Sequence, residues 1–195
     1  AVPVRENGYW YYSRTEEGKQ YPIYCRKKTS LEADEQVLLD GNELAKSEKF
    51  LSIGQRQVSD DGNLLAFTTD TTGFRDVFLH DRDVDGDGNM DEAGQIQTRR
   101  VSVNSQGVPG NGPSQDASVT QEGRYVVFES LANNLAGNDT NGESDIFIHD
   151  RDAGVTRRLT EGPRGESFIG PSRAPRISAN GALLVFLTSG LNAGG

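Results

Sequence analysis

One eight-residue string occurs twice in this chain and constrains its fold more than any other feature. Residues 76–83 read Asp-Val-Phe-Leu-His-Asp-Arg-Asp, and residues 145–152 read Asp-Ile-Phe-Ile-His-Asp-Arg-Asp. A second string, in which a glycine turn precedes an apolar run, occurs three times, at 59–67, 120–128 and 178–186. Repeats of this kind indicate units that stack on their neighbours.

The repeated strings predict strands. Their turn glycines, Gly62, Gly123 and Gly181, lie 61 and then 58 residues apart, a longer period than helical repeats show. The apolar run that follows each glycine is short and bounded by turn residues, which is typical of a strand buried on both faces. The length differences between units fall in the segments between the constant strings, where loops tolerate insertion.

Counting the strands gives the fold class. We predict an all-β protein, a partial β-propeller of about three and a half four-stranded antiparallel blades, in a single propeller-type domain over residues 1–195. Thirteen strands are expected, and the first blade lacks its innermost strand because the first recognisable run is Tyr9–Ser13. The chain is thus expected to begin and end inside a blade. The predicted boundaries are an incomplete first blade at 1–49, a second at 50–110, a third at 111–170 and a truncated fourth at 171–195.

Charge and composition limit the classes of molecule that the chain is expected to bind. Twenty basic and 29 acidic residues give a net charge of -9, which repels phosphate backbones and anionic lipid, so we expect neither a nucleic-acid nor a membrane partner. A single cysteine excludes an internal disulfide and leaves the compartment undecided. We expect Cys25 to be a small buried residue rather than a nucleophile, since its own blade has no histidine.

Two stretches of the chain resemble known families. Residues 9–75, with the aromatic run Tyr9–Tyr12 and the turn string 59–67, resemble the propeller domain of oligopeptidase B, in the prolyl oligopeptidase family. Residues 76–195 resemble the WD40-like repeats of TolB-like bacterial propellers. The join falls near Arg75, so we interpret the chain as a chimera of two propeller sequences; a single divergent propeller gene is the alternative.

The first resemblance bears on catalysis. In the prolyl oligopeptidase family the propeller is a lid over a separate hydrolase domain, which carries the catalytic serine, aspartate and histidine. The sequence contains no Gly-x-Ser-x-Gly string, the usual setting of that serine. We therefore predict that the chain is not an enzyme and holds no catalytic residue.

One acidic segment is a candidate metal site. Residues 83–92 read Asp-Val-Asp-Gly-Asp-Gly-Asn-Met-Asp-Glu, and alternating carboxylates around glycine turns are typical of calcium loops. The predicted Ca²⁺ ligands are Asp83, Asp85, Asp87, Asp91 and Glu92. The segment departs from the EF-hand pattern because position 12 of the loop is Gly94, and a solvated acidic hairpin is the alternative.

The histidines and paired arginines recur with the repeat. His80 and His149 occupy equivalent positions in successive blades, so they cannot share one substrate atom, and we assign both a structural role. The pairs Arg99-Arg100 and Arg157-Arg158 are expected to bind the acids that end the neighbouring strand: Asp81, Asp83, Asp150 and Asp152.

A partial ring leaves bare edges and blade faces, which favour association. The favoured function is a non-catalytic scaffold that closes its ring by forming a homodimer, with Ala174–Ser178 of one chain supplying the missing innermost strand of the other. The first alternative is a calcium-stabilised periplasmic or extracellular interaction module. The second is the propeller lid of a serine oligopeptidase.

Overall fold

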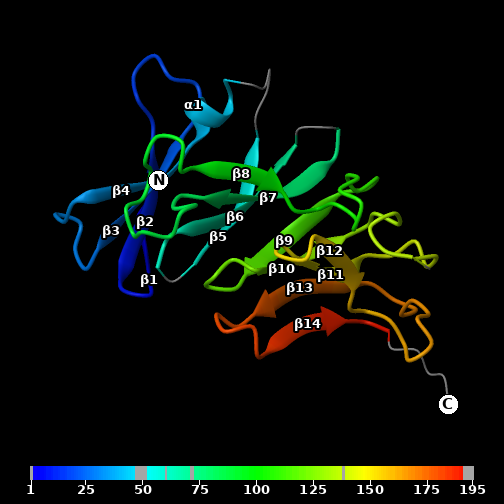
Figure 1. Ribbon diagram of the computed structural model, residues 1–195. Helices are drawn as coiled ribbons and strands as arrows, with labels where there is room; N and C mark the ends of the chain where they lie inside the picture. The colour runs from blue at the N-terminus through cyan, green and yellow to red at the C-terminus, as the bar shows by residue number, and fades with distance from the viewer. Residues whose placement is uncertain (1, 47–51, 60, 71–72, 138, 191–195) are drawn as a thin grey trace. The chain divides into compact units, whose positions relative to one another are not determined.

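The structure, a computed structural model, describes residues 2–46, 52–59, 61–70, 73–137 and 139–190. It consists of antiparallel sheets, and within each sheet neighbouring strands are consecutive along the chain (Figure 1). The all-β, partial-propeller fold class is confirmed. The chain forms two compact units, Ala1–Ile53 and Gly54–Gly195. No helix in the described part is long and apolar enough to cross a membrane.

The first unit contains a complete four-stranded sheet. The prediction of three strands in this sheet is therefore wrong, because a fourth strand is present. Val4–Glu6 forms an innermost strand that pairs with the aromatic run. Asn7 and Gly8 connect the two strands with φ angles of 47° and 79°, the left-handed pair that a two-residue hairpin turn requires. The strands are β1 (Val4–Glu6), β2 (Tyr9–Arg14), β3 (Ile23–Lys28) and β4 (Glu35–Asp40), followed by the short helix α1 (Gly41–Leu44).

The second unit begins with two four-stranded sheets built from the repeat. The second sheet contains β5 (Ile53–Val58), β6 (Leu64–Asp70), β7 (Arg75–Asp81) and β8 (Gln97–Arg100). The third contains β9 (Ser114–Val119), β10 (Tyr125–Ser130), β11 (Asp145–Asp150) and β12 (Val155–Arg158). Residues 50 and 51, expected to begin the second blade, lie outside the described residues.

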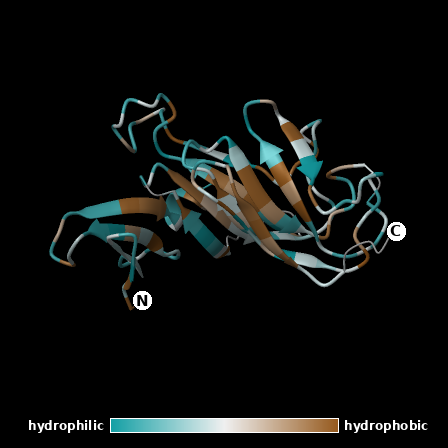
Figure 2. Ribbon diagram, turned by 90° about the horizontal axis from the view of Figure 1, so that it is seen from below, coloured by the Kyte–Doolittle hydropathy of each residue, from teal (hydrophilic) through white to brown (hydrophobic). Residues whose placement is uncertain are grey.

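The apolar runs of β6 and β10 form the core, as their sequence predicts. Leu64 and Ala66 of β6 join Val119, Val126 and Phe128 in one buried cluster, because β6 packs against β9 of the next sheet. Figure 2 shows the hydrophobic residues concentrated in the strands, with the loops largely hydrophilic. Burial of such side chains supplies the main stabilising free energy of stacked sheets.

The turn before each apolar run has the expected geometry. Gly62, Gly123 and Gly181 have φ angles of 86°, 71° and 70°. Only glycine adopts this region without strain. At Gly123 the neighbours also leave no room, since a Cβ there would lie 2.4 Å from Leu64 Cδ1.

The last sheet contains two described strands, β13 (Ser172–Ile177) and β14 (Leu184–Thr188). β13 pairs with β14 and packs against β9 and β10, so it belongs to its own chain's last sheet. The innermost position of the first sheet is filled by β1. The predicted donation of Ala174–Ser178 to complete a partner's first blade is therefore wrong in its mechanism, because the short, polar strand β1 already occupies that position.

Candidate functional site

The acidic hairpin after β7 brings three of the predicted calcium ligands together. One carboxylate oxygen from each of Asp83, Asp85 and Asp87 lies within 4.8 Å of the others. Asp83 is buried, and its carboxylate accepts hydrogen bonds from the backbone amides of Asp87 (3.2 Å) and Gly88 (3.0 Å). These bonds fold the segment so that the alternate carboxylates converge. Hard oxygen ligands in such an arrangement suit Ca²⁺.

The other two predicted ligands do not join this cluster. Asp91 accepts a hydrogen bond of 2.9 Å from Nε of Arg82 and pairs with the same guanidinium through its second oxygen. Arg82 is buried and also donates to the carbonyl oxygen of Gly62 (2.9 Å). Asp91 thus fastens the hairpin to the sheet, while Glu92 is exposed and lies outside the carboxylate cluster.

The histidines have the structural role that their repetition predicts. Nδ1 of His80 lies 2.8 Å from Oγ1 of Thr98, and Nδ1 of His149 lies 2.9 Å from Oγ1 of Thr156. Each pair joins neighbouring strands in its own sheet. Burial lowers the pKa of His80 to about 4, with Arg82 lowering it further, so the ring is neutral at physiological pH.

Cys25 is the buried residue that the sequence predicts. Its side chain is 1% exposed, and burial raises the pKa of the thiol to about 11. A thiol with so high a pKa carries almost no thiolate at neutral pH and is a poor nucleophile.

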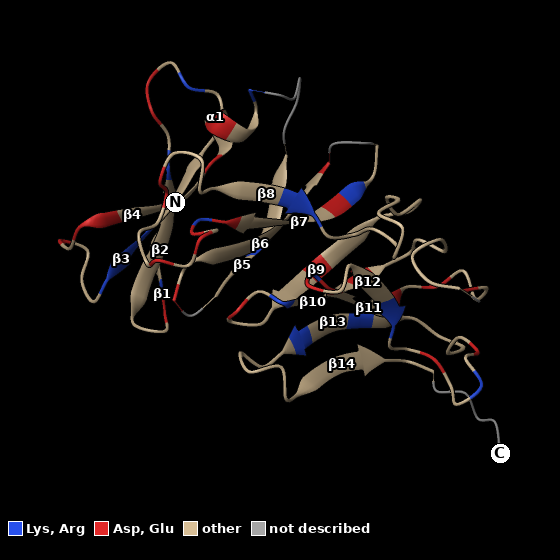
Figure 3. Cartoon of the chain, viewed as in Figure 1, with Lys and Arg blue, Asp and Glu red and all other residues tan. Residues whose placement is uncertain are grey.

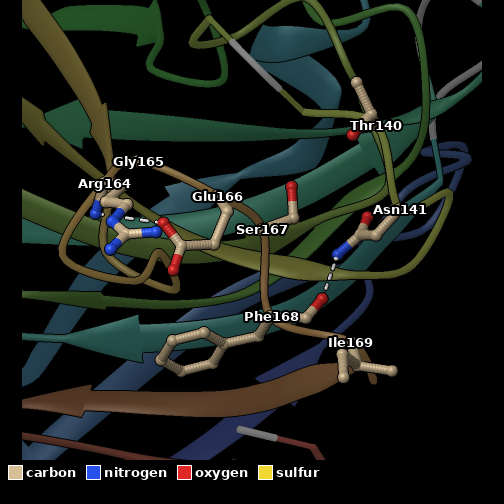
Figure 4. A pocket seen from close by; sticks show the side chains of 8 residues that line it. All are labelled: Thr140, Asn141, Arg164, Gly165, Glu166, Ser167, Phe168 and Ile169. Carbon is tan, nitrogen blue, oxygen red and sulfur yellow. Dashed lines mark hydrogen bonds between the residues drawn. The ribbon is translucent and has the colours of Figure 1, made fainter. Parts of the chain in front are cut away.

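A surface hollow of about 610 Å³ lies between two loops of the second unit (Figure 4). Asn141, from the loop before β11, crosses to the second loop and donates to the carbonyl oxygen of Phe168 (2.9 Å). In the second loop, the backbone amide of Arg164 donates to the carboxylate of Glu166 (3.0 Å). The lining residues are Thr140, Asn141 and residues 164–169.

A buried charge cluster that contacts lining residues of this hollow was not predicted from the sequence. The Arg158 guanidinium lies 3.6 Å from Asp139 and 3.8 Å from Asp145, and these three side chains are 0%, 4% and 0% exposed. Burial, reinforced by the neighbouring Asp145, raises the pKa of Asp139 to about 6. Burial also raises the pKa of Asp145, although the Thr160 hydroxyl and Arg158 oppose the rise.

The expected partners of the paired arginines are therefore wrong. Arg158 binds the acid that begins β11, and Arg100 likewise binds Asp76, at 3.4 Å, where β7 begins. In both sheets the arginine lies opposite the phenylalanine of the repeated string, near the start of the strand. The acids that end β7 and β11, Asp81 and Asp150, bind Arg151 and Arg124 instead.

The last sheet exposes a row of large apolar side chains. Leu183, Val185 and Leu187 are 71%, 64% and 71% exposed, and they alternate along β14 and the residue before it. Alternate residues of a strand point to the same face. In Figure 3 β14 carries no charged residue, whereas β13 beside it has basic residues.

The family relationship covers the first half of the chain. Residues 1–100 match the family described as "Prolyl oligopeptidase, N-terminal beta-propeller domain". The chain belongs to this family of propeller domains. The match confirms the resemblance of residues 9–75 and extends past the join expected near Arg75.

Two curated relatives agree with the family assignment. The propeller chain is 36% identical over 100 residues to dipeptidyl aminopeptidase BI of Pseudoxanthomonas mexicana, covering 44% of the chain and 14% of that protein. It is 39% identical over 77 residues to protease 2 of Moraxella lacunata, covering 37% of the chain and 11% of that protein. The chain therefore spans a small part of each relative, and the matched domain is the non-catalytic propeller.

Solved structures show the same fold over nearly the whole propeller chain. A post-proline cleaving enzyme from Rickettsia typhi superposes with a TM-score of 0.58 at 14% identity, covering 95% of this chain and 27% of the enzyme. TolB from Acinetobacter baumannii gives a TM-score of 0.52 at 19% identity, covering 92% of this chain and 34% of TolB. The resemblance of the second half to TolB-like propellers is thus confirmed at the level of fold.

Proposed function

We propose that this chain is a non-catalytic propeller scaffold that associates with a second copy of itself through the row Leu183, Val185 and Leu187, called here the β14 face. The observation that carries the proposal is the contrast between this face and its equivalents in the repeat. Val185 is 64% exposed, while the equivalent Ala66 and Val127 are fully buried.

The repeat also indicates what covers such a face. β6 packs against β9, and β10 packs against β13, so the first strand of each following sheet covers the second strand of the sheet before it. β1 is the first strand of its own sheet, and all three of its residues are exposed, including Val4 at 61%. The β1 sheet of a second copy therefore supplies the missing cover. This contact joins two different surfaces, so it produces a closed ring or an open chain according to the angle between copies.

The experiment is the oligomeric state, measured by size-exclusion chromatography with light scattering from low to high micromolar concentration. The wild-type chain is expected to form a dimer or larger assembly, and Val185→Lys is expected to remain monomeric because a lysine is costly to bury. Leu131→Lys is the matched control, since Leu131 is 51% exposed in a loop. A wild-type monomer throughout this range, or equal effects of the two substitutions, contradicts the proposal.

A second candidate function is the propeller lid of a serine oligopeptidase. The family match and the peptidase relatives support it. The test is binding of this chain to the separately purified hydrolase domain of a relative, with the chain alone expected to hydrolyse no peptide substrate. Hydrolysis by the chain alone, or no binding to the hydrolase domain, rejects this candidate.

A third candidate is a calcium-stabilised module, supported by the convergence of Asp83, Asp85 and Asp87. Calcium binding to the folded state raises the melting temperature by mass action. The test is a melting curve with millimolar Ca²⁺ for the wild type and for Asp85→Ala plus Asp87→Ala. An unchanged wild-type curve excludes the candidate, and a rise that survives in the variant places any binding elsewhere.

A further inference from the structure

The buried cluster of Asp139, Asp145 and Arg158 holds one more negative than positive group when all three are ionised. The side chain of Arg158 is completely buried, and both carboxylates approach the same Nη1 atom. Glu161 reaches the other Nη atom from 3.9 Å but is 46% exposed, so water screens it. A buried carboxylate without its own counter-charge favours the neutral, protonated form.

The preceding sheet provides an internal comparison. There Arg100 pairs with Asp76 (3.4 Å), in the arrangement that Arg158 and Asp145 repeat. The residue equivalent to Asp139 is Asp70, which is 47% exposed and pairs with Arg75 across 3.8 Å. The second buried carboxylate is therefore a feature of the third sheet and is not required by the repeat.

The same cluster fastens both loops that line the hollow. Arg158 donates to Oγ of Ser167 (2.7 Å) and to the carbonyl oxygen of Gly165 (3.1 Å), which holds the loop at 164–169. Asn141, two residues from Asp139, donates to Asp145 (3.3 Å) and to the carbonyl oxygen of Phe168. A change of charge at Asp139 thus acts on both walls of the hollow.

We propose that Asp139 is a proton-operated latch: with its proton bound it holds the loops at 139–144 and 164–169 together, and loss of the proton releases them. The proposal concerns a different surface from the β14 face and does not depend on self-association.

The direction of the pH dependence follows from the surroundings of Asp139. Burial raises its pKa to about 6, the adjacent carboxylate of Asp145 raises it further, and Arg158 lowers it. A released, solvated Asp139 has the ordinary pKa of 3.8, so the latched state binds the proton more tightly. Latching is therefore strongest below pH 4 and is lost as the pH rises through 6. The other charged groups on the surrounding loops are Glu143, Glu161, Arg164 and Glu166.

Hydrogen exchange of the whole chain, read by mass spectrometry at about pH 5 and about pH 7.5 and corrected for the intrinsic exchange rate, tests the latch. Protection of the two loops in the wild type is expected to fall about tenfold between these values, since pH 5 lies only about one unit below the Asp139 pKa of about 6 and each unit changes the latching equilibrium by at most about tenfold. Asp139→Asn, which has no titrating group, is expected to show no such fall. Equal protection at both values in the wild type, or the same fall in the variant, overturns the proposal.

Asp70→Asn is the matched control, because it removes the equivalent carboxylate of the preceding sheet and should leave the fall intact. A loss of the fall in this control overturns the assignment to Asp139. If Asp139→Asn does not fold, carboxyl carbon resonances of the wild-type chain supply the answer by titration. An Asp139 pKa near 3.8 then refutes the latch, and one near 6 supports it.

Discussion

Truncating one valine at two equivalent places of the repeat tests whether the β14 face is bare. Val127 and Val185 occupy the same position of the repeated string and differ in exposure, 0% against 64%. Both lie in the second unit, so a single unfolding transition reports both substitutions. Val127→Ala and Val185→Ala remove the same atoms from two different environments.

The burial of each side chain sets the expected cost. Losing two buried methyl equivalents at about 0.8 kcal/mol each lowers the free energy of unfolding by about 1.6 kcal/mol. Val127 is fully buried, and the cavity left there brings the total to about 2–3 kcal/mol. At Val185 only about a third of the side chain is buried in the isolated chain, so Val185→Ala should cost about 0.5 kcal/mol.

Urea unfolding followed by circular dichroism measures both values. At low protein concentration the costs should differ about fivefold. At high concentration a second copy covering the β14 face should raise the cost of Val185→Ala while leaving that of Val127→Ala unchanged, because association stabilises the folded state by mass action. Equal costs for the two substitutions at low concentration would refute the reasoning, since they would mean that Val185 is already covered.

Three further substitutions or treatments have defined outcomes. Gly123→Ala should destabilise the second unit by at least about 1 kcal/mol more than Gly107→Ala. Both glycines have positive φ, but only Gly123 has close neighbours that a Cβ would meet. Thermal unfolding of the two variants measures the difference. Cys25 should react with a thiol reagent at pH 8 only after denaturation, because its thiol is buried with a pKa of about 11; rapid labelling of the folded chain would contradict this. Asp139→Asn should raise the free energy of unfolding at pH 7.5 by at most about 3 kcal/mol, and it should have little effect below pH 4. The reason is that the wild type loses the stability linked to the Asp139 proton as the pH rises through 6, whereas asparagine has no proton to lose. His80, whose pKa is lowered to about 4, has the opposite effect, because its neutral form stabilises the folded state as the pH rises. This effect is the same in the wild type and in Asp139→Asn, so it cancels when their free energies of unfolding are subtracted.

The repeat made most of the strands predictable. The apolar runs at 64–67 and 125–128 and the string that begins at Asp76 and Asp145 fall within β6, β10, β7 and β11. These segments are long enough and apolar enough for pattern alone to identify them. Strand β1 was missed because Val4, Arg5 and Glu6 carry no apolar run, although the Asn-Gly turn after them is a strong hairpin signal.

The charge pairs were less predictable, because sequence proximity does not fix which end of a strand an arginine faces. Arg100 and Arg158 each follow a strand that begins and ends with an acid, and the antiparallel register decides which of the two acids is paired. The second carboxylate of the latch had one sequence signal. Asp139 precedes Asp145 by the same six residues as Asp70 precedes Asp76, but burial of the first and exposure of the second depend on the loops around them.

Copies of one repeat share the interactions that folding requires, so the departures between copies indicate where individual function lies. Among the described residues of the repeat copies, the acidic hairpin follows β7, the second buried carboxylate precedes β11, and the bare apolar face lies on β14. Each departure carries a cost that the other copies avoid: repulsion between carboxylates, a buried excess charge, and apolar surface in water. We propose that a ligand, a proton and a second copy offset these costs, one for each departure. Replacing one of these three features by the equivalent residues of another repeat copy should therefore stabilise the isolated chain. The same replacement should abolish only the binding of the ligand, proton or second copy that belongs to that feature.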